Sequence, residues 1–256
     1  MGDWDPAVYE RYKTQRDRPA LDLLLQIPPE LNPSEIWDLG CGTGEHAALL
    51  AARHQRAAVH GMDSSEAMLK AARRRDANVD WRLGDIAAFA PETPPDLIFS
   101  NAALQWIPDH ARLFPALAKT LASGGVLACQ MPVNDFGRWR ELLRETAALA
   151  PWADALTGVA LISNDAAADY YDRLAPLCGG GVDIWTTEYL HELRGEDAVL
   201  EWTRGTTLRP YLNAQTPQMR GAFEDAFAAV LRDAYPMRDD GVTLLPFRRL
   251  FIVARR

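Results

Sequence analysis

An apolar segment that breaks into alternate glycines places the strongest constraint on this chain. Residues 36–44 read Ile-Trp-Asp-Leu-Gly-Cys-Gly-Thr-Gly. The apolar run predicts a buried strand, and the three glycines predict a loop whose backbone can take positive φ. Without side chains at these positions, the amides that open the next helix can face a bound group. The sequence therefore predicts a nucleotide-like ligand, held directly after the first strand of a sheet.

Downstream of this loop, short apolar stretches alternate with segments of helical periodicity. Strands that are separated by helices need crossover connections, so they form a parallel sheet with helices on both faces. The predicted class is therefore α/β, with a doubly wound sheet. The sequence predicts strands at 35–39, 58–62, 79–83, 96–100 and 125–131, and helices at 45–53, 65–75 and 113–122.

After residue 132 the pattern becomes mainly helical. We expect helices at 138–148 and 165–174, strands at 182–190 and 248–254, and a helical insertion at 196–235. Such an insertion is long enough to form a lid over the carboxyl edge of the sheet, where open α/β folds bind ligands.

Two helices are expected near the N-terminus, because Asp5-Pro6 and Asp17-Arg18-Pro19 both have the pattern of a helix start. The second would carry Leu21, Leu24 and Leu25 on one face. The length of 256 residues fits one domain with an elaboration or two small domains. We expect a single domain over 1–256, in which helices within 1–30 cover the site and 32–132 form the cofactor-binding core.

The composition excludes several classes of function. A net charge of −8 disfavours a nucleic-acid surface, which usually needs a basic face. No apolar run is long enough to span a membrane and the first residues do not resemble a signal peptide, so we expect a cytoplasmic protein with no membrane partner. The cysteines Cys41, Cys129 and Cys178 lack CxxC spacing, which argues against a structural zinc site, and no metal is expected.

The residues after the next two strands narrow the choice of cofactor. A dinucleotide fingerprint wants GxGxxG, but Glu45 stands where the third fingerprint glycine would be. Asp38, directly before the glycines, can offer a carboxylate to a cationic amine. Asp63 ends the second strand, where a carboxylate can accept from two ribose hydroxyls, and Gly84-Asp85-Ile86 follows the third strand. Taken singly, Asp63 could cap a helix and Asp85 could be a turn residue.

Together, these motifs resemble the class I S-adenosylmethionine-dependent methyltransferases. The resemblance implies a Rossmann-like sheet of seven strands, mostly parallel, whose last strand is antiparallel. It also implies that Asp38 and Gly40, Gly42 and Gly44 hold the methionine part of S-adenosylmethionine. The ribose would lie at Asp63 and its neighbour Ser64, the adenine at Asp85 and Ile86, and the transferable methyl near Asn101.

Segments outside the cofactor motifs resemble the branch of that family that methylates trans-aconitate. They include Trp4-Asp5-Pro6, the run from Leu104 to His110, Leu208-Arg209-Pro210 and the run from Arg249 to Arg256. The implied products are a monomethyl ester and S-adenosylhomocysteine. A carboxylate with a reference pKa near 4 is already ionised at neutral pH, so no general base and hence no catalytic residue is assigned. Catalysis would then depend on aligning the acceptor carboxylate with the methyl group and on excluding water.

A polycarboxylate acceptor needs anchors, and arginine matches a carboxylate with two parallel hydrogen bonds. The candidates are Arg209, Arg16 and Arg18, with Trp106 shaping the pocket, and Tyr170 and His191 as further polar groups. Each arginine could equally be solvated, and Trp106 could equally be core. His110 fits a helix cap better than a catalytic group.

Three other functions stay open from the sequence. The enzyme could methylate a different acid, amine or hydroxyl; the chain could bind S-adenosylmethionine without catalysis; or it could be a nicotinamide oxidoreductase, which Glu45 and Asp85 weaken. The oligomeric state is left open.

Overall fold

The computed structural model describes residues 13–133, 137–159, 164–204 and 207–256, and it forms two compact units. The first consists of residues up to 132, 164–187 and 249–256. The second consists of 133–163 and 188–248. The predicted insertion at 196–235 lies inside the second unit, which also takes in 133–163 and parts of both long strands.

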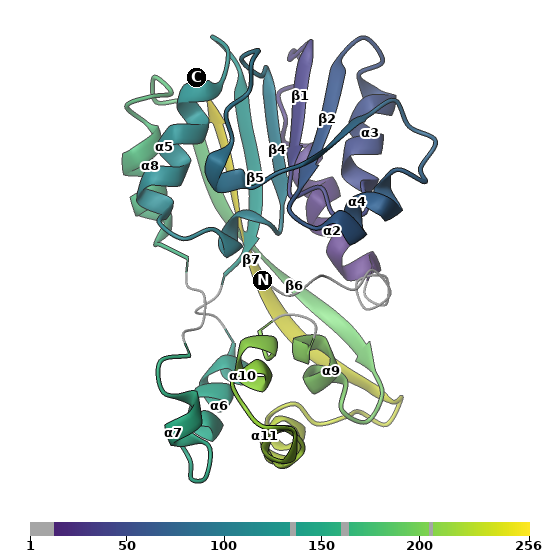
Figure 1. Cartoon of the computed structure of the whole chain (residues 1–256), viewed down its shortest axis with the longest axis vertical. Coiled ribbons are helices and arrows are strands. Elements are labelled where there is room, and N and C mark those ends of the chain that lie inside the picture. The colour runs from purple at the N-terminus through teal and green to yellow at the C-terminus, as the bar shows by residue number, and fades with distance from the viewer. Residues whose placement is uncertain (1–12, 134–136, 160–163, 205–206) are drawn as a thin grey trace. The chain divides into compact units, whose positions relative to one another are not determined.

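The predicted α/β class is confirmed by a seven-stranded sheet in the order β3-β2-β1-β4-β5-β7-β6 (Figure 1). The pairs formed among β1 to β5 are all parallel, and β7 runs antiparallel to β5. The strands are Glu35–Leu39 (β1), Ala58–Asp63 (β2), Asp80–Leu83 (β3), Leu97–Asn101 (β4), Val126–Pro132 (β5), Val182–Arg194 (β6) and Val242–Arg255 (β7).

Helices cover both faces of this sheet. On one face lie α2 (Lys13–Leu24), α3 (Glu45–Arg53) and α4 (Glu66–Ala72), and on the other lie α5 (His110–Thr120) and α8 (Ala167–Leu174) (Figure 1). Two short 3-10 turns, η1 (Ile86–Ala88) and η2 (Leu104–Trp106), follow β3 and β4. Every residue of β4 and all but the last residue of β5 are buried, as their near-continuous apolar sequences require in a doubly covered sheet.

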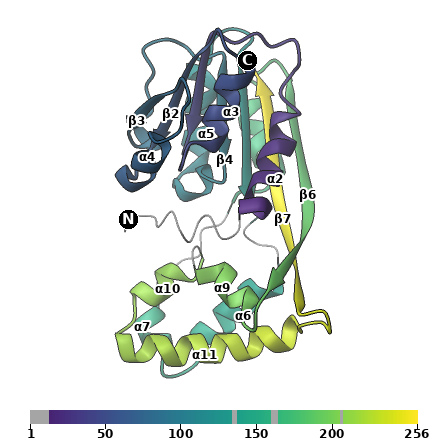
Figure 2. The same ribbon diagram turned by 90° about the vertical axis from the view of Figure 1, so that its right-hand side faces the viewer.

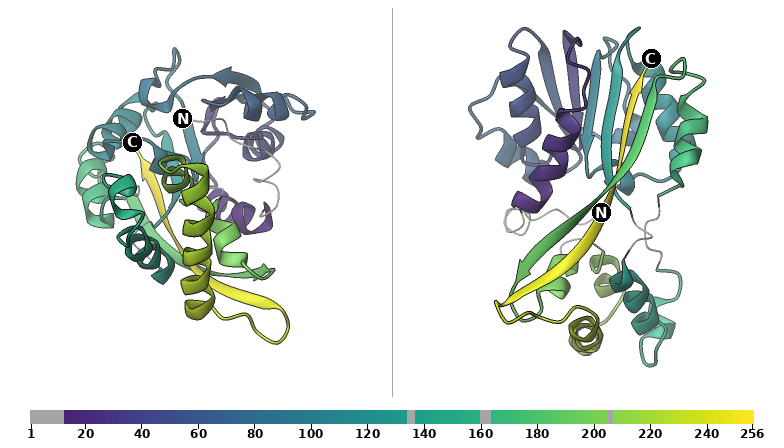
Figure 3. Two further views of the ribbon diagram at one scale, coloured as in Figure 1. Left: turned by 60° about the horizontal axis from the view of Figure 1, so that its bottom comes forward. Right: turned by 180° about the vertical axis from the view of Figure 1, so that it is seen from behind.

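The second unit is largely helical. Its helices are α6 (Arg138–Ala147), α7 (Ala153–Leu156), α9 (Ala198–Arg204), α10 (Arg209–Asn213) and α11 (Pro217–Ala234). β6 and β7 are longer than predicted, and each runs without a break from the first unit into the second (Figures 2 and 3). The two units are therefore joined partly by continuous strands.

The N-terminal region departs from the sequence prediction. The helix predicted to begin at Asp5-Pro6 falls outside the described residues. The start predicted at Asp17-Arg18-Pro19 is wrong, because α2 already includes Lys13 and holds Pro19 in its interior. The helix buries Ala20, Leu23 and Leu24, and Ile27 just after its end is also buried. Of the three leucines predicted to share a face, only Leu24 is buried, whereas Leu21 and Leu25 are exposed.

Candidate cofactor and acceptor site

The three loop glycines all adopt positive φ, but they serve different contacts. An added Cβ at Gly40 would lie 2.1 Å from Ala103 Cβ, and one at Gly44 would lie 2.4 Å from the ring of Trp81. A Cβ at Gly42 would meet nothing within 4 Å. Gly40 and Gly44 are therefore fixed by close packing inside the protein, whereas Gly42 borders open space where a ligand can approach bare backbone.

Asp63, at the end of β2, holds the glycine loop through hydrogen bonds to backbone amides. Its Oδ2 accepts a 2.9 Å hydrogen bond from the Gly42 amide, and its Oδ1 accepts one of 2.9 Å from the Ser65 amide. An ionised carboxylate has about four acceptor positions, so both oxygens can still accept from a diol. The Ser65 side chain caps α4 by accepting from the Met68 amide, which leaves Asp63 as an organiser of the loop and a candidate ligand group. Ser64 beside it is exposed.

Asp38 is the most perturbed carboxyl group of this region. It is 1% exposed, and its Oδ2 has no hydrogen-bond partner among the described residues. Burial, reinforced by the negative charge of Asp63, raises the pKa of Asp38 to about 8 from its ordinary value of 3.8, although a hydrogen bond from the Ala47 amide acts in the opposite direction. A buried carboxyl with an unfilled oxygen beside a backbone loop is suited to a cationic ligand group, which would favour its ionised form.

The other end of the expected cofactor site follows β3. Asp85 is exposed and caps η1, its Oδ1 accepting from the Ala87 amide at 2.9 Å. Ile86 is buried, and its Cδ1 lies 3.6 Å from the position of a Cβ on Gly40. The Asp85 and Ile86 segment therefore adjoins the glycine loop, with an apolar side chain next to it and a carboxylate in solvent.

β4 ends in a strained backbone position. Ala102 has a φ of 53°, which is uncommon for a residue with a side chain. Its neighbour Asn101 is buried, and Asn101 Oδ1 has no partner among the described residues. Strained residues often persist at ligand sites. Asn101 and Asp38 also share one face of the sheet, because Asp38 pairs with Phe99, two residues before Asn101.

The chain is similar to known methyltransferases over its whole length. Residues 36–125 match a family model described as a methyltransferase domain. A trans-aconitate 2-methyltransferase of Methylobacterium radiotolerans is 46% identical over 100% of this chain and 99% of the relative. The chain belongs to the trans-aconitate 2-methyltransferase family. A member from Paracidovorax citrulli is 44% identical over 100% of this chain and 99% of its own length. A member from Yersinia pestis is 43% identical over 99% of this chain and 98% of its own length.

Solved structures support the fold of this family member. The YcgJ protein of Bacillus subtilis has a TM-score of 0.58 at 13% identity, covering 93% of this chain and 98% of that one. A Haemonchus contortus phosphoethanolamine N-methyltransferase, solved with S-adenosylhomocysteine, has a TM-score of 0.52 at 19% identity, and the match covers 93% of this chain and 52% of that one. The expected seven-stranded, Rossmann-like methyltransferase fold is thereby confirmed.

Two other features are absent from the described residues. They contain no group of three or more His, Cys, Asp or Glu side chains that could hold a metal ion. Within the same ranges, no helix is both long and apolar enough to cross a membrane.

Among the predicted acceptor residues, Tyr170 and Trp106 lie in the first unit. Tyr170 is 0% exposed, and its hydroxyl lies 2.6 Å from His110 Nδ1 and accepts from the Asp165 amide. His110 Nε2 lies 2.9 Å from the Leu104 carbonyl, so it must carry the proton, and the tyrosine hydroxyl donates to Nδ1. This chain of bonds ties α8 to η2, which carries the half-buried Trp106. The geometry favours a packing role for Tyr170. His110 follows the capping residue Asp109.

The predicted arginine anchors are spread over both units. Arg18 is exposed on α2, and Arg16 lies on the same helix with its side chain outside the described part. Arg209 begins α10 in the second unit and is half-buried. His191, also in the second unit, is buried among aromatic rings, 4.8 Å from the Trp202 centroid and 5.5 Å from that of Phe247. Their roles in acceptor binding stay predictions.

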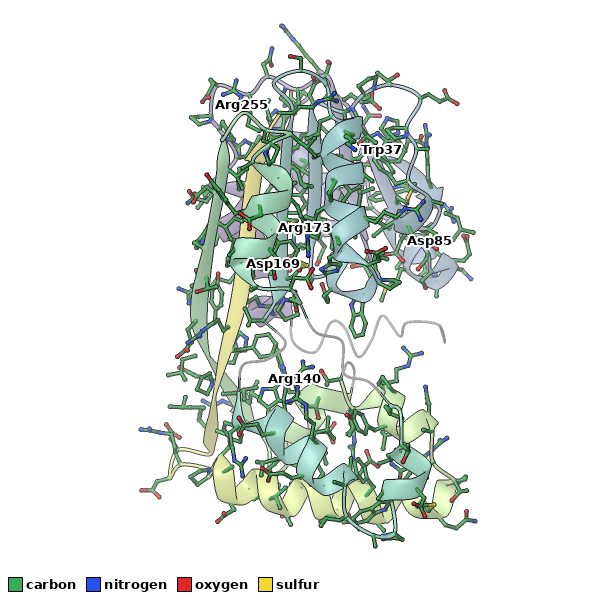
Figure 4. All side chains as sticks on the ribbon, turned by 90° about the vertical axis from the view of Figure 1, so that its left-hand side faces the viewer. Trp37, Asp85, Arg140, Asp169, Arg173 and Arg255 are labelled. Atoms are coloured by element: carbon green, nitrogen blue, oxygen red, sulfur yellow. The ribbon has the colours of Figure 1, made fainter. Side chains whose placement is uncertain are left out.

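Sequence reasoning missed two buried arginines. Arg249 on β7 is 3% exposed and lies beside Gln130 of β5. Arg140 on α6, labelled in Figure 4, is also buried, and its guanidinium lies 5.3 Å from the centroid of the Trp139 ring. A polar residue inside an apolar strand was the available signal for Gln130 and Arg249, since their neighbours read Ala-Cys-Gln-Met and Arg-Leu-Phe-Ile.

Proposed function

We propose that the protein transfers a methyl group from S-adenosylmethionine to one carboxylate of trans-aconitate, giving a monomethyl ester and S-adenosylhomocysteine. The observation that carries this proposal is identity of 43–46% to trans-aconitate 2-methyltransferases over essentially the full chain. The similarity therefore includes the segments outside the shared methyltransferase domain. In a fold that hosts many functions, acceptor specificity resides in such segments.

The described residues fit the cofactor. S-adenosylmethionine supplies an electrophilic methyl group on its sulfonium. Asp38 offers a buried carboxylate to the cationic amine of the methionine part, and Gly42 leaves its backbone open to close approach. Asp63 can accept from the ribose hydroxyls while it holds the loop, and Asp85 and Ile86 can receive the adenine. Asn101 is the last residue of β4, and its buried Oδ1 has no hydrogen-bond partner among the described residues.

The acceptor requires binding rather than deprotonation. A carboxylate is ionised at neutral pH, so the chain has to hold it in line with the methyl group and exclude water. The acceptor's other carboxylates need cationic or amide donors. We retain Arg209, Arg16, Arg18 and Trp106 as candidates, and residues 196–235 as the predicted lid.

The decisive experiment is turnover with a panel of acids. Purified protein is incubated with S-adenosylmethionine and, separately, trans-aconitate, cis-aconitate, citrate and a monocarboxylate. Esters and S-adenosylhomocysteine are quantified by mass spectrometry. Formation of trans-aconitate monomethyl ester, at the highest kcat/KM of the panel, is expected. A preference for another acid would change the acceptor and keep the reaction. Binding of S-adenosylhomocysteine without any turnover would leave a noncatalytic binding protein.

A further inference from the structure

The carboxyl ends of β4 and β5, together with the part of β7 that pairs with β5 there, bring three polar side chains to one face of the sheet. Asn101 pairs with Gln130, and Gln130 pairs with Phe251. Paired residues share a face, and so do residues two apart on one strand, so Arg249 lies on this face too. Asp38 belongs to the same face through its pairing with Phe99.

The Arg249 side chain reaches Gln130 directly. Its Nη1 donates to Gln130 Oε1 at 3.4 Å, and both residues are buried, Gln130 at 0% and Arg249 at 3% exposure. Because a guanidinium can only donate, this contact fixes the orientation of the amide, with Oε1 toward the arginine. Gln130 Nε2 is then a buried donor without a partner among the described residues. Such a donor costs free energy unless something fills it.

These two side chains form a pair of donors suited to an oxyanion. A guanidinium presents a planar fork, and the neighbouring amide N–H adds a donor of fixed direction. A carboxylate with one oxygen on each would satisfy both. The site lies on the side of the sheet edge away from β2 and β3, whereas Asp63 and Asp85 follow those two strands.

We propose that Arg249 and Gln130 form the subsite that receives one of the non-reacting carboxylates of the acceptor. β4 and β7 are two strand spacings apart, about 10 Å at roughly 4.8 Å per spacing, a distance that the long arginine side chain partly covers. An acid anchored there could present a second carboxylate beyond Asn101, where the methyl group is expected. The inference rests on the proposed function and names the residues that give it polycarboxylate specificity.

The test compares matched variants. Arg249→Gln removes the cation. Gln130→Glu places a carboxylate beside Arg249, which satisfies the arginine internally and repels an incoming acid. Arg255→Gln is the control, since Arg255 lies on the same strand, is exposed, and pairs with Glu30. Figure 4 shows Arg255 and Asp85 at opposite ends of the first unit, so the control is remote from the carboxyl edge.

For the first two variants we expect KM for trans-aconitate to rise roughly 10- to 100-fold, as for loss of a charge-assisted hydrogen bond. The Kd for S-adenosylhomocysteine, measured by calorimetry, should stay at the wild-type value, and Arg255→Gln should match wild type in both. Glutaconate and itaconate each lack one carboxylate of trans-aconitate. For whichever of them lacks the anchored group, the difference between wild type and variants should vanish.

The outcomes separate the subsite from the reaction. No ester from wild type would overturn the proposed function and the subsite with it. Ester from wild type with unchanged KM in both variants would overturn the subsite alone, as would an equal loss of S-adenosylhomocysteine affinity. If Arg249→Gln does not fold, Gln130→Glu and the two shortened acids decide the matter.

Discussion

Replacing Asp38 by asparagine should stabilise the ligand-free protein while weakening cofactor binding. The pKa of Asp38 is about 8 in the folded chain against an ordinary value of 3.8, because burial and Asp63 oppose its charge. The folded state therefore holds a proton that the unfolded state releases. By linkage, stability falls as pH rises from about 4 to about 8 and is level above that. Asparagine has no proton to lose and keeps an oxygen for the Ala47 amide.

The size of the effect follows from the two pKa values. One pKa unit corresponds to about 1.4 kcal/mol, so at pH 7 ionisation of Asp38 favours the unfolded chain by up to about 4 kcal/mol. At pH 5 the same term is below about 2 kcal/mol. Asp38→Asn removes it. A gain of 2 kcal/mol would raise Tm by about 4–8 °C in a chain of this size.

The assay is thermal unfolding of both proteins from pH 5 to pH 8, with and without S-adenosylhomocysteine. Asp172→Asn, which removes an exposed carboxyl on α8, is the matched control. We expect the advantage of the Asp38 variant to grow with pH, and its affinity for S-adenosylhomocysteine to drop roughly 10- to 100-fold. A variant that is less stable than wild type throughout, or an advantage that does not change with pH, would refute the reasoning.

Three further predictions follow from the same site. As pH increases toward 8, the affinity of the wild-type protein for S-adenosylhomocysteine should rise by up to about tenfold per pH unit, since the ligand's amine binds the ionised form of Asp38. Calorimetry in several buffers should find no such pH dependence in the Asp38→Asn variant. Gly44→Ala should destabilise the fold by about 1–3 kcal/mol in urea unfolding, because its Cβ meets Trp81. Gly42→Ala should lower the free energy of unfolding by about 1–2 kcal/mol and should chiefly raise the Kd for the cofactor. Equal cofactor Kd values for the two alanine variants would contradict the separate roles of the two glycines. Tyr170→Phe should lose about 1–3 kcal/mol of stability through His110 with KM for trans-aconitate unchanged, whereas a raised KM would make Tyr170 an acceptor residue.

The sheet and the conformation of the glycine loop were predictable because their signals are local. Each of the first five strands is a short run that contains apolar residues and is bounded by turn residues, and no observed bound differs from the predicted one by more than one residue. The glycine loop carries its conformation in its own residue types, since three non-glycine residues at φ values of 53–81° would be strained.

The N-terminal helix was harder to predict because two local sequence rules gave the wrong start and the wrong buried face. Proline favours the first turn of a helix, but Pro19 lies inside α2. Leu21, Leu24 and Leu25 were predicted to share a face, yet only Leu24 of the three is buried, together with Ala20, Leu23 and, just after the helix, Ile27. Both sets have helical spacing, so only the position of the sheet decides between them.

The contacts of Arg249 and of Tyr170 could not be predicted because they join residues that are distant in sequence. Arg249 and Gln130 are 119 residues apart, and Tyr170 and His110 are 60 apart. A sequence shows neither the partner that buries an arginine nor the one that occupies a tyrosine hydroxyl. The apolar neighbours of Arg249 were a signal for its burial, but its partner is visible only when the strands are placed.

The position of β7 between β5 and β6 has a consequence for how the protein is made. β7 is the last strand along the chain, but it occupies the interior of the sheet and supplies one neighbour of β5. A nascent chain that has emerged as far as β6 would leave the apolar edge of β5 unpaired, which is a template for aggregation. Release of residues 242–255 from the ribosome, rather than synthesis of the cofactor loop, should therefore set the moment at which the protein becomes soluble and able to bind its ligands.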